Sequence, residues 1–322
     1  MKIAVVGCGA VGSYYGAMLS RAGQDVHFLL RSDYEAVRRN GVSIRSAKGD
    51  FNARPCCART PEEIGPCDAV LVALKTTANN QFSKLLPSLV KLRTAIVTLQ
   101  NGLGNEEQLA SLFPPTQIVG GICFVCLNRT EPGVVHHLGE GAILIGEFSG
   151  WPEPRTHDLA TMFRHAGVPC KVSDNLARSR WEKLVWNIPF NGLGVAGAAG
   201  YDVVSGKKCQ VSDVGECLAT DKLLGDPRWE KLVRELMHEV IATARTQGVE
   251  IAEALIEKHI SRTRPVGAYK ASTLLDFEQG RPLELESMFL QPLRRARRSG
   301  VETPRLAVLC EVLRQLAVSR VR

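Results

Sequence analysis

Lys2-Ile-Ala-Val-Val-Gly7-Cys-Gly9-Ala-Val-Gly12 joins a short apolar run to three glycines in the pattern G-x-G-x-x-G. The continuous apolar run Ile3–Val6 predicts a buried strand, and the segment Ser13–Ala22 predicts a helix that ends at Gly23. A second strand is expected at Asp25–Leu30. Glycines placed between the strand and the helix of such a unit are typical of a dinucleotide-binding loop.

Each glycine of this pattern has a physical task. The first permits a tight turn, the second lets the backbone approach a pyrophosphate, and the third lets the helix and strand pack closely. The start of the helix then offers free N–H groups and a partial positive charge to the phosphates. The residues expected to bind the cofactor in this loop are Gly7, Cys8, Gly9, Ala10, Val11 and Gly12.

The end of the second strand distinguishes between the two nicotinamide dinucleotides. An Asp or Glu at this place usually accepts a hydrogen bond from the ribose 2′-hydroxyl of NAD. Here the strand ends in Leu29-Leu30-Arg31-Ser32, and a cation followed by a hydroxyl suits a 2′-phosphate. The sequence therefore predicts NADP, with Arg31 as the phosphate ligand, although Asp33 and Glu35 stand close by and leave NAD as the alternative.

The rest of the first half alternates apolar runs with helical segments, as expected for a parallel sheet covered on both faces. Lys75 and Asn101 follow two of these runs, and ligands of open parallel sheets bind at the carboxyl ends of the strands, so both should face the cofactor. Two later runs flank Gly139-Glu-Gly141, which predicts a turn and an antiparallel edge. The expected strands after the second are 69–74, 95–99, 118–125, 133–138, 142–147 and 170–172, with a helix at 158–166.

The second half has the longer apolar periodicity of amphipathic helices. We expect a cofactor-binding domain at residues 1–174 and a helical substrate domain at residues 175–322. The segment Val195–Asp226 has weak periodicity and predicts a long connection. The helices are expected at 228–247, 251–258, 273–278, 286–299 and 303–318.

Composition favours an ordinary globular protein in the cytoplasm. The chain has 322 residues, 45% of them hydrophobic, and a net charge of +7, which favours anionic ligands in general. No secretory signal opens the sequence and no apolar run is long enough to span a membrane. The basic run 294–298 has helical spacing without aromatic residues, which favours a solvated helix face over a nucleic-acid interface.

The ten cysteines are expected to be reduced thiols. Cys123 and Cys126 form a lone C-x-x-C in an apolar run, where cysteine acts as a small hydrophobic residue. Cys56 and Cys57 are adjacent in sequence. Because no second pair stands at zinc-ligand spacing, we expect no metal site.

A polar strip marks the start of the second half. Lys183, Asn187 and Asn191 recur at four-residue spacing, which places them on one face of a helix whose other residues are largely apolar. An exposed polar face would be expected to carry charges of both signs, so the strip favours a ligand-binding role. Pro189 is expected to disturb the helix and so to weaken the alignment of Asn191 with the other two.

Taken together, these pieces resemble the ketopantoate reductase family (2-dehydropantoate 2-reductases) over essentially the whole chain. The resemblance implies an α/β chain with a Rossmann-like doubly wound sheet, followed by an all-helical domain of the 6-phosphogluconate dehydrogenase C-terminal type. The matching pieces are Gly7-Cys-Gly9-Ala-Val-Gly12, Arg31, Lys75, Gln100-Asn101-Gly102, Lys183…Asn187…Asn191, Ser272-Thr-Leu-Leu-Asp276 and Gly280-Arg-Pro-Leu-Glu284-Leu-Glu286.

The resemblance also implies a reaction, in which NADPH delivers hydride to the keto carbon of ketopantoate and pantoate results. Lys183 would then be the general acid, because a positioned ammonium stabilises the developing alkoxide and supplies its proton. Glu284 matches an active-site carboxylate that orients Lys183 or touches cofactor or substrate. Asn187, Asn191 and Ser272 match substrate-binding residues, and Asn101 matches a residue near the nicotinamide and the substrate carboxylate.

Two departures keep other readings open. Tyr269 stands where many relatives carry a substrate-binding Asn, and a Gly/Ala-rich stretch follows Asn191. Another 2-oxo acid is therefore an alternative substrate, and a non-catalytic NADPH-binding sensor is the alternative from a different class. The expected partner of the chain is a small 2-oxo acid. Relatives occur as monomers and as homodimers, so a homodimer is possible but not required.

Overall fold

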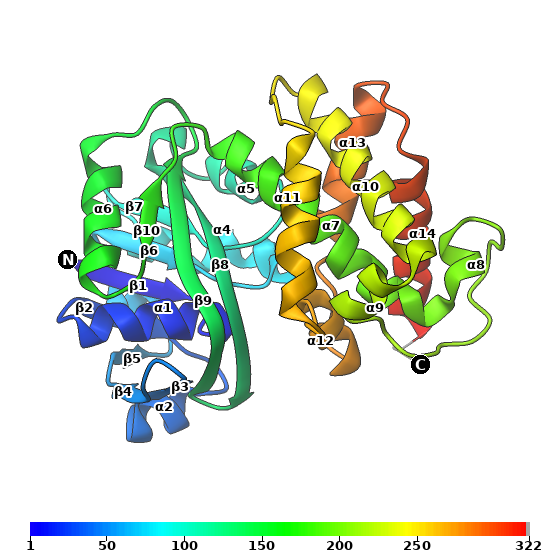
Figure 1. Ribbon diagram of the computed structural model, residues 1–322. Helices are drawn as coiled ribbons and strands as arrows, with labels where there is room; N and C mark the ends of the chain where they lie inside the picture. Colours follow the sequence, from blue (N-terminus) through cyan, green and yellow to red (C-terminus); the bar gives the residue numbers. More distant parts are fainter. Residues whose placement is uncertain (320–322) are drawn as a thin grey trace. The chain divides into compact units, whose positions relative to one another are not determined.

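The computed structural model describes residues 1–319, and these divide after Leu176 into two compact units. Unit 1 comprises Met1–Leu176 and is built around one mixed sheet, whereas unit 2 begins at Ala177 and consists of helices (Figure 1). The boundary lies two residues beyond the expected one. The α/β class and the order of a sheet domain before a helical domain are as the sequence predicted.

Unit 1 contains a sheet of ten strands in the order β4-β3-β9-β8-β7-β6-β1-β2-β5, with β10 paired to β9. Pairing is parallel except in the β3–β4 and β8–β9 pairs. The strands are β1 (Lys2–Val6), β2 (Asp25–Leu29), β3 (Val42–Ser46), β4 (Phe51–Ala53), β5 (Cys56–Ala58), β6 (Ala69–Val72), β7 (Ala95–Thr98), β8 (Ile118–Glu131), β9 (Val134–Glu147) and β10 (Cys170–Val172). The helical segments are α1 (Ala10–Arg21), α2 (Tyr34–Asn40), α3 (Pro61–Ile64), η1 (Thr76–Gln81), α4 (Phe82–Leu85), η2 (Pro87–Leu89), α5 (Asn105–Ala110), η3 (Pro115–Gln117) and α6 (Pro154–His165).

Both faces of this sheet are buried, which explains the continuous apolar runs. Along β1, Ile3 and Val5 belong to the core shared with α1 and α6. The alternate residues Ala4 and Val6 belong to the core on the opposite face. Helix α1 contacts β1, β2, β3, β4, β8 and β9, so the sheet curls around it. The first helix begins at Ala10, earlier than the sequence indicated.

The region after β7 differs from the expectation. Residues 118–147 form one hairpin of two strands, each 14 residues long, which run side by side as a long ribbon (Figure 1). The segment Gly139-Glu-Gly141 lies inside β9 and is not a turn. Glu140 and Gly141 have positive φ there, and the pairing with β8 shifts register beside them. The expected edge is also wrong, because β9 pairs with β3 on its other side.

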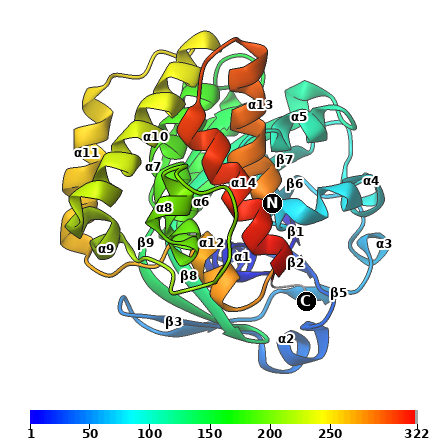
Figure 2. The same cartoon turned by 90° about the vertical axis from the view of Figure 1, so that its right-hand side faces the viewer.

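Unit 2 is arranged around α7 (Leu176–Ala196), most of whose apolar side chains are fully buried. Figure 2 shows α10, α13 and α14 in this helical part, where α10 contacts both of the others. The remaining segments are η4 (Gly197–Ala199), α8 (Tyr201–Val204), α9 (Thr220–Gly225), α10 (Pro227–Thr246), α11 (Ala254–Thr263), η5 (Arg264–Val266), α12 (Ser272–Glu278), the π-helical turn η6 (Glu286–Leu290), α13 (Gln291–Arg298) and α14 (Pro304–Ser319).

Two details of unit 2 correct the sequence-based expectations. Pro189 lies inside α7, and the helix continues through it to Ala196, so the polar strip keeps helical spacing. The stretch Val195–Asp226 is not one long connection, because it begins with the end of α7 and contains η4, α8 and α9. Its irregular part is held by hydrogen bonds such as that from Gly215 N to Ala198 O, at 2.7 Å. Among residues 1–319, no helix is long and apolar enough to cross a membrane.

Candidate functional site

The glycine loop of unit 1 has the three geometries that its sequence predicts. Gly7 has φ of +101°, and a Cβ there would lie 2.3 Å from Leu74 N. At Gly12 a Cβ would lie 2.2 Å from Gly7 O, so β1 and α1 approach too closely for any side chain. A Cβ on Gly9 would meet nothing within 4 Å. The backbone at Gly9 therefore faces open space, as an approaching pyrophosphate requires.

The start of α1 suits a negatively charged group. Gly9 is the N-cap, no side chain caps the helix, and its first turn has no acidic residue. The unpaired N–H groups and the positive end of the helix dipole therefore point out of the loop. Burial raises the pKa of the Cys8 thiol, and the nearby Cys57 and Asp33 add to the shift. A neutral thiol therefore stands between the first two glycines.

Arg31 follows β2 with an exposed side chain and has no ion pair among the residues that the structure describes. Its acidic neighbour Asp33 is only 6% exposed and accepts hydrogen bonds from Arg129 and from the Ser32 hydroxyl. The second nearby carboxylate, on Glu35, pairs with Arg59 at 2.5 Å. Both carboxylates that left NAD as an alternative are therefore already paired with an arginine, and the cation of Arg31 remains for a ligand.

Lys75 and Asn101 lie just beyond β6 and β7, which are parallel neighbours in the sheet. The turns that carry them are joined by side-chain hydrogen bonds that the sequence did not predict. The Gln100 amide donates to Leu74 O at 2.9 Å and to Asn79 Oδ1 at 2.7 Å. Asn79 in turn donates to Asn105 Oδ1, and Asn105 donates to Asn101 O, both at 2.9 Å. This chain of amides fixes the two turns at one edge of the sheet.

In unit 2, the polar strip of α7 lies among buried apolar side chains. Lys183 is half-buried, whereas Asn187 and Asn191 are 6% and 2% exposed. The hydrogen bonds within residues 1–319 include none to the Asn187 carboxamide. Within residues 1–319 no fully buried side-chain nitrogen or oxygen atom lacks a partner, so the amide atoms of Asn187 reach accessible space, where a ligand or water can bond to them. Asn187 therefore has donor and acceptor capacity to offer to a substrate.

Asn191 is brought together with Ser272 at the start of α12. Its Oδ1 accepts from Thr273 N at 3.0 Å and from Ser272 Oγ at 3.3 Å. The amide oxygen of Asn191 thus caps α12, which has no side-chain cap of its own. Only the Nδ2 donors of Asn191 remain for a ligand, and the Ser272 side chain is exposed.

Tyr269 lies beside the polar strip and belongs to an aromatic cluster on α7. The ring centroid of Trp186 lies 4.9 Å from that of Phe190 and 6.3 Å from that of Tyr269. The Trp186 indole donates to Thr263 Oγ1 at 2.8 Å, which fixes the cluster. A bulky ring therefore stands next to the residues of the α7 strip.

The Gly/Ala-rich stretch after Asn191 has a packing role. A Cβ on Gly192 would lie 2.6 Å from Leu309 Cδ2, and one on Gly197 would lie 2.5 Å from Leu218 Cγ. A side chain at either position would have to displace these leucines. Glu284 is half-buried and precedes the turn η6, where its carbonyl accepts from Met288 N at 3.4 Å.

Other residues of the chain bring together groups that no spacing in the sequence predicted. Ligand atoms of Asp25, His27 and Cys56 lie within 4.8 Å of one another on β2 and β5. His27 Nε2 and Asp25 Oδ1 are already paired at 2.9 Å. The ten cysteines are all free thiols, and Cys123 is buried in β8.

Comparisons with known proteins agree with this geometry. The family model of ketopantoate reductase PanE/ApbA matches residues 3–150, and the model of its C-terminal part matches residues 210–317. The chain belongs to the ketopantoate reductase family. It is therefore an oxidoreductase of the α/β class that uses a nicotinamide cofactor and acts on a small keto acid.

Individual ketopantoate reductases match the whole length of the chain. It is 39% identical to the 2-dehydropantoate 2-reductase of Nostoc sp., with 98% of this chain and 95% of the relative covered. The crystal structure of the 2-dehydropantoate 2-reductase from Geobacter metallireducens has 47% identity and a TM-score of 0.89, over 98% of this chain and 99% of that one. The enzyme of that name from Methylococcus capsulatus has 33% identity and a TM-score of 0.87, over 100% and 98%.

Proposed function

We propose that this ketopantoate reductase catalyses the NADPH-dependent reduction of 2-dehydropantoate to pantoate, a step towards pantothenate and coenzyme A. The observation that carries the proposal is the buried strip on α7, in which a lysine stands beside an amide without a protein partner. A keto acid offers a carbonyl and a carboxylate, which are acceptors for just such donors. We also propose a cytoplasmic location, because NADPH and 2-dehydropantoate are both water-soluble. The proposed reaction does not require that the chain form a homodimer.

The bound cofactor supplies a hydride, and the chain must manage the charge that this creates. As the keto carbon gains the hydride, its oxygen gains negative charge and then a proton. The Lys183 ammonium stabilises that charge and donates the proton, after which water returns a proton to the amine. Asn187 binds substrate oxygen atoms, and Asn191 holds Ser272 where its exposed hydroxyl can do the same. Glu284 is assigned to orienting Lys183 or a hydroxyl group.

The assignment of Lys183 is tested by steady-state assay of 2-dehydropantoate with NADPH. We expect Lys183→Ala to lower kcat by at least about a hundredfold, the usual contribution of general acid catalysis, with an unchanged Kd for NADPH. Lys183→Arg keeps the positive charge but not the readily donated proton, so it should bring the KM for 2-dehydropantoate close to the wild-type value while kcat stays low. Full activity of Lys183→Ala would exclude the proton-donor role.

The preference for NADPH is assigned to Arg31 and Ser32, supported by the arginine-paired carboxylates of Asp33 and Glu35. A charge-assisted hydrogen bond contributes about 1.5–3 kcal/mol, and exposure of Arg31 places the expected loss near the lower end. Arg31→Ala should therefore weaken NADPH binding by roughly 10- to 30-fold and leave NADH unaffected. Lys84→Ala, which removes an exposed cation elsewhere in unit 1, is the matched control. Equal losses for both cofactors in Arg31→Ala would contradict the assignment.

A second 2-oxo acid is kept as the alternative substrate because of Tyr269. Its ring next to Trp186 adds apolar surface where a small amide would add hydrogen bonds. A panel of 2-oxo acids with branched, linear and aromatic side chains distinguishes the two proposals by kcat/KM. Turnover of an aromatic or linear acid in preference to 2-dehydropantoate would establish the alternative.

A further inference from the structure

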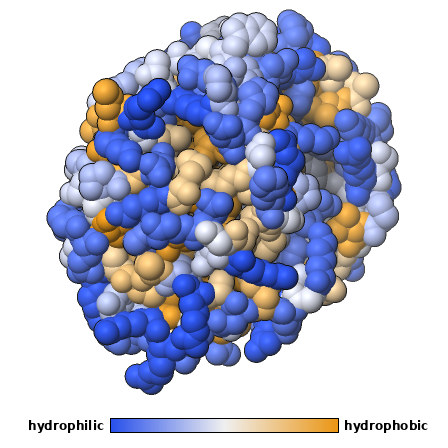
Figure 3. Space-filling view, turned by 90° about the vertical axis from the view of Figure 1, so that its left-hand side faces the viewer, coloured by the Kyte–Doolittle hydropathy of each residue, from blue (hydrophilic) through white to orange (hydrophobic). Residues whose placement is uncertain are grey.

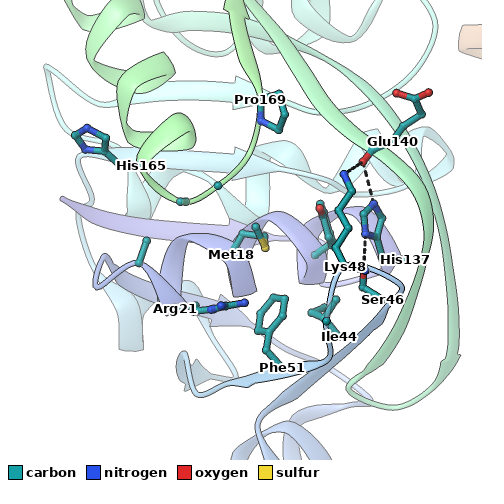
Figure 4. A pocket seen from close by; sticks show the side chains of 15 residues that line it. Met18, Arg21, Ile44, Ser46, Lys48, Phe51, His137, Glu140, His165 and Pro169 are labelled. Carbon is teal, nitrogen blue, oxygen red and sulfur yellow. Dashed lines mark hydrogen bonds between the residues drawn. The ribbon is translucent and has the colours of Figure 1, made fainter.

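Unit 1 contains a cavity of about 420 Å³ at the C-terminal end of α1. Its walls come from α1, from the β3–β4 hairpin, from β9 and from the turn between α6 and β10 (Figure 4). The glycine loop lies at the other end of α1, which is 12 residues long and so spans about 18 Å. The cavity is therefore separate from the dinucleotide loop. Its volume falls in the range of about 300–1,000 Å³ that is usual for small-molecule sites.

The interior of this cavity is partly apolar. Met18, Ile44, Phe51, Ala166 and Pro169 are among its lining residues. Figure 3 views the molecule from the left of Figure 1 and shows apolar side chains gathered near the centre of a largely hydrophilic face. Such a lining takes the apolar part of a ligand, whereas a cavity for a free inorganic ion would be polar throughout.

Two cations lie in the wall of the cavity without a carboxylate partner. The guanidinium carbon of Arg21 lies 4.6 Å from the centroid of the Phe51 ring. Lys48 Nζ donates to the carbonyl oxygen of Glu140 at 3.2 Å, while the Glu140 carboxylate points away from it (Figure 4). Glu140 is the only acidic residue of the lining, and within residues 1–319 neither cation forms an ion pair. The cavity therefore has a net positive charge to offer.

Capping of the helix ends does not account for these basic residues. Helices α1 and α6 each end in a backbone motif that satisfies their last carbonyls. Gln24 N donates to Leu19 O at 3.1 Å, and Val168 N donates to Phe163 O at 3.0 Å. Because these bonds close the helices, Arg21 on α1 and His165 on α6 are not needed as caps.

The lysine is held in place by a polar network in the wall. His137 is 5% exposed, and its Nε2 donates to Glu140 O at 3.1 Å. The Ser46 hydroxyl bonds to His137 Nδ1 at 2.9 Å and accepts from Lys48 N at 3.1 Å. Glu140 has φ of 60°, and it is the one residue other than glycine with positive φ in the described chain. This unfavourable conformation turns its carbonyl towards Lys48 and His137.

We propose that this cavity binds a small organic anion, with its carboxylate or phosphate between Arg21 and Lys48 and its apolar part against Met18, Ile44 and Phe51. The site belongs to unit 1 alone and takes no part in the reduction. Its chemistry matches a ligand that carries one anionic group on an aromatic or branched aliphatic body. The stacked Arg21 and the bonded Lys48 are already positioned for it, so little ordering accompanies binding.

The test is a 19F NMR titration of the protein in the presence of saturating NADPH, so that the dinucleotide loop is occupied. The probes are 4-fluorophenyl phosphate, 4-fluorobenzoate and the neutral 4-fluorobenzyl alcohol. We expect at least one of the two anions to bind saturably and the alcohol to bind at least about tenfold more weakly. The anion that binds more tightly distinguishes a phosphate ligand from a carboxylate ligand.

Two variants and one control complete the experiment. Arg21→Gln with Lys48→Gln should weaken the anion by at least about tenfold, because both charge-assisted contacts are lost. Arg39→Gln with Lys84→Gln removes the same charge from exposed positions outside the cavity and should leave the Kd unchanged. Ala22→Trp, at an exposed lining position, should block binding by filling the cavity. Unchanged affinity in the Arg21/Lys48 variant, equal binding of the alcohol, or no saturable binding of either anion would overturn the proposal.

Discussion

Two glycines of the cofactor loop, Gly9 and Gly12, should respond differently to substitution by alanine: Gly12→Ala should lower stability, and Gly9→Ala should weaken NADPH binding. A Cβ on Gly12 would lie 2.2 Å from Gly7 O, and a backbone oxygen between β1 and α1 cannot yield as a side chain could. Alanine favours the helix over glycine by about 1 kcal/mol, but overpacking costs about 1–3 kcal/mol, and here the contact is with backbone. We therefore expect Gly12→Ala to lower the free energy of unfolding by about 2 kcal/mol.

Gly9→Ala should leave folding almost unchanged. Its φ of −75° and ψ of −159° suit any residue, and nothing lies within 4 Å of the new methyl group. The cost is the weaker N-cap, about 0.5 kcal/mol. The methyl group instead occupies the space through which the pyrophosphate reaches the N–H groups of α1. The Kd for NADPH should therefore rise by at least about tenfold, which corresponds to roughly 1.4 kcal/mol.

The measurements are urea and thermal unfolding, both followed by circular dichroism, and NADPH titration followed by fluorescence. For a domain of this size, 2 kcal/mol corresponds to a drop in Tm of roughly 4–8 °C for Gly12→Ala, against about 2 °C or less for Gly9→Ala. Gly139→Ala, which also meets nothing within 4 Å, is the control for the substitution itself. Wild-type NADPH affinity in Gly9→Ala, or wild-type stability in Gly12→Ala, would refute the reasoning.

Substitutions at two further residues test other parts of the structure. Asn191→Ala should lower the free energy of unfolding by about 1–2 kcal/mol, since Thr273 N loses its acceptor, and it should also raise the KM for the keto acid. Asn191→Asp should recover the stability but not the KM, because its negative charge repels a keto acid. A KM that follows the stability in both variants would count against a substrate-binding role for Asn191. Burial raises the pKa of Cys310 to about 12, so the folded protein keeps a proton that the unfolded chain releases above its ordinary pKa near 9.0, and stability falls as pH rises between these values. Titration of Cys310 contributes a slope of about 1 kcal/mol per pH unit to the free energy of unfolding between pH 9 and 11. Cys310→Ala should reduce the measured slope by that amount, whereas an unaltered slope would show that Cys310 does not contribute.

The features that the sequence predicted are those set by neighbouring residues. The glycine loop lies within six consecutive residues, and the strip on α7 follows from the period of one helix. The β8–β9 hairpin was missed in part because Gly139 and Gly141 are turn residues in most settings. In this chain β8 pairs with Gly139 and Glu140 across the hairpin and holds the segment in an irregular strand. Pairing across the sheet overrode the local preference.

Contacts between distant residues explain the rest. The amide chain through Asn79, Gln100 and Asn105 links two turns that are about 26 residues apart, and each residue alone is an unremarkable polar residue. The bond between Asn191 and α12 joins positions separated by 82 residues. No periodicity or spacing contains this information, because it depends on which turns the sheet and the helices bring together.

Asp33 shows how such a contact alters a functional argument. In the sequence it stands two residues after Arg31, where an acidic side chain would favour NAD. In the structure Arg129, 96 residues away on β8, donates to its carboxylate and leaves it 6% exposed. An acceptor that is buried and already bonded to a cation offers little to a ribose hydroxyl, and its charge no longer opposes a phosphate at Arg31. The proposed preference for NADPH therefore depends on β8 as much as on the end of β2.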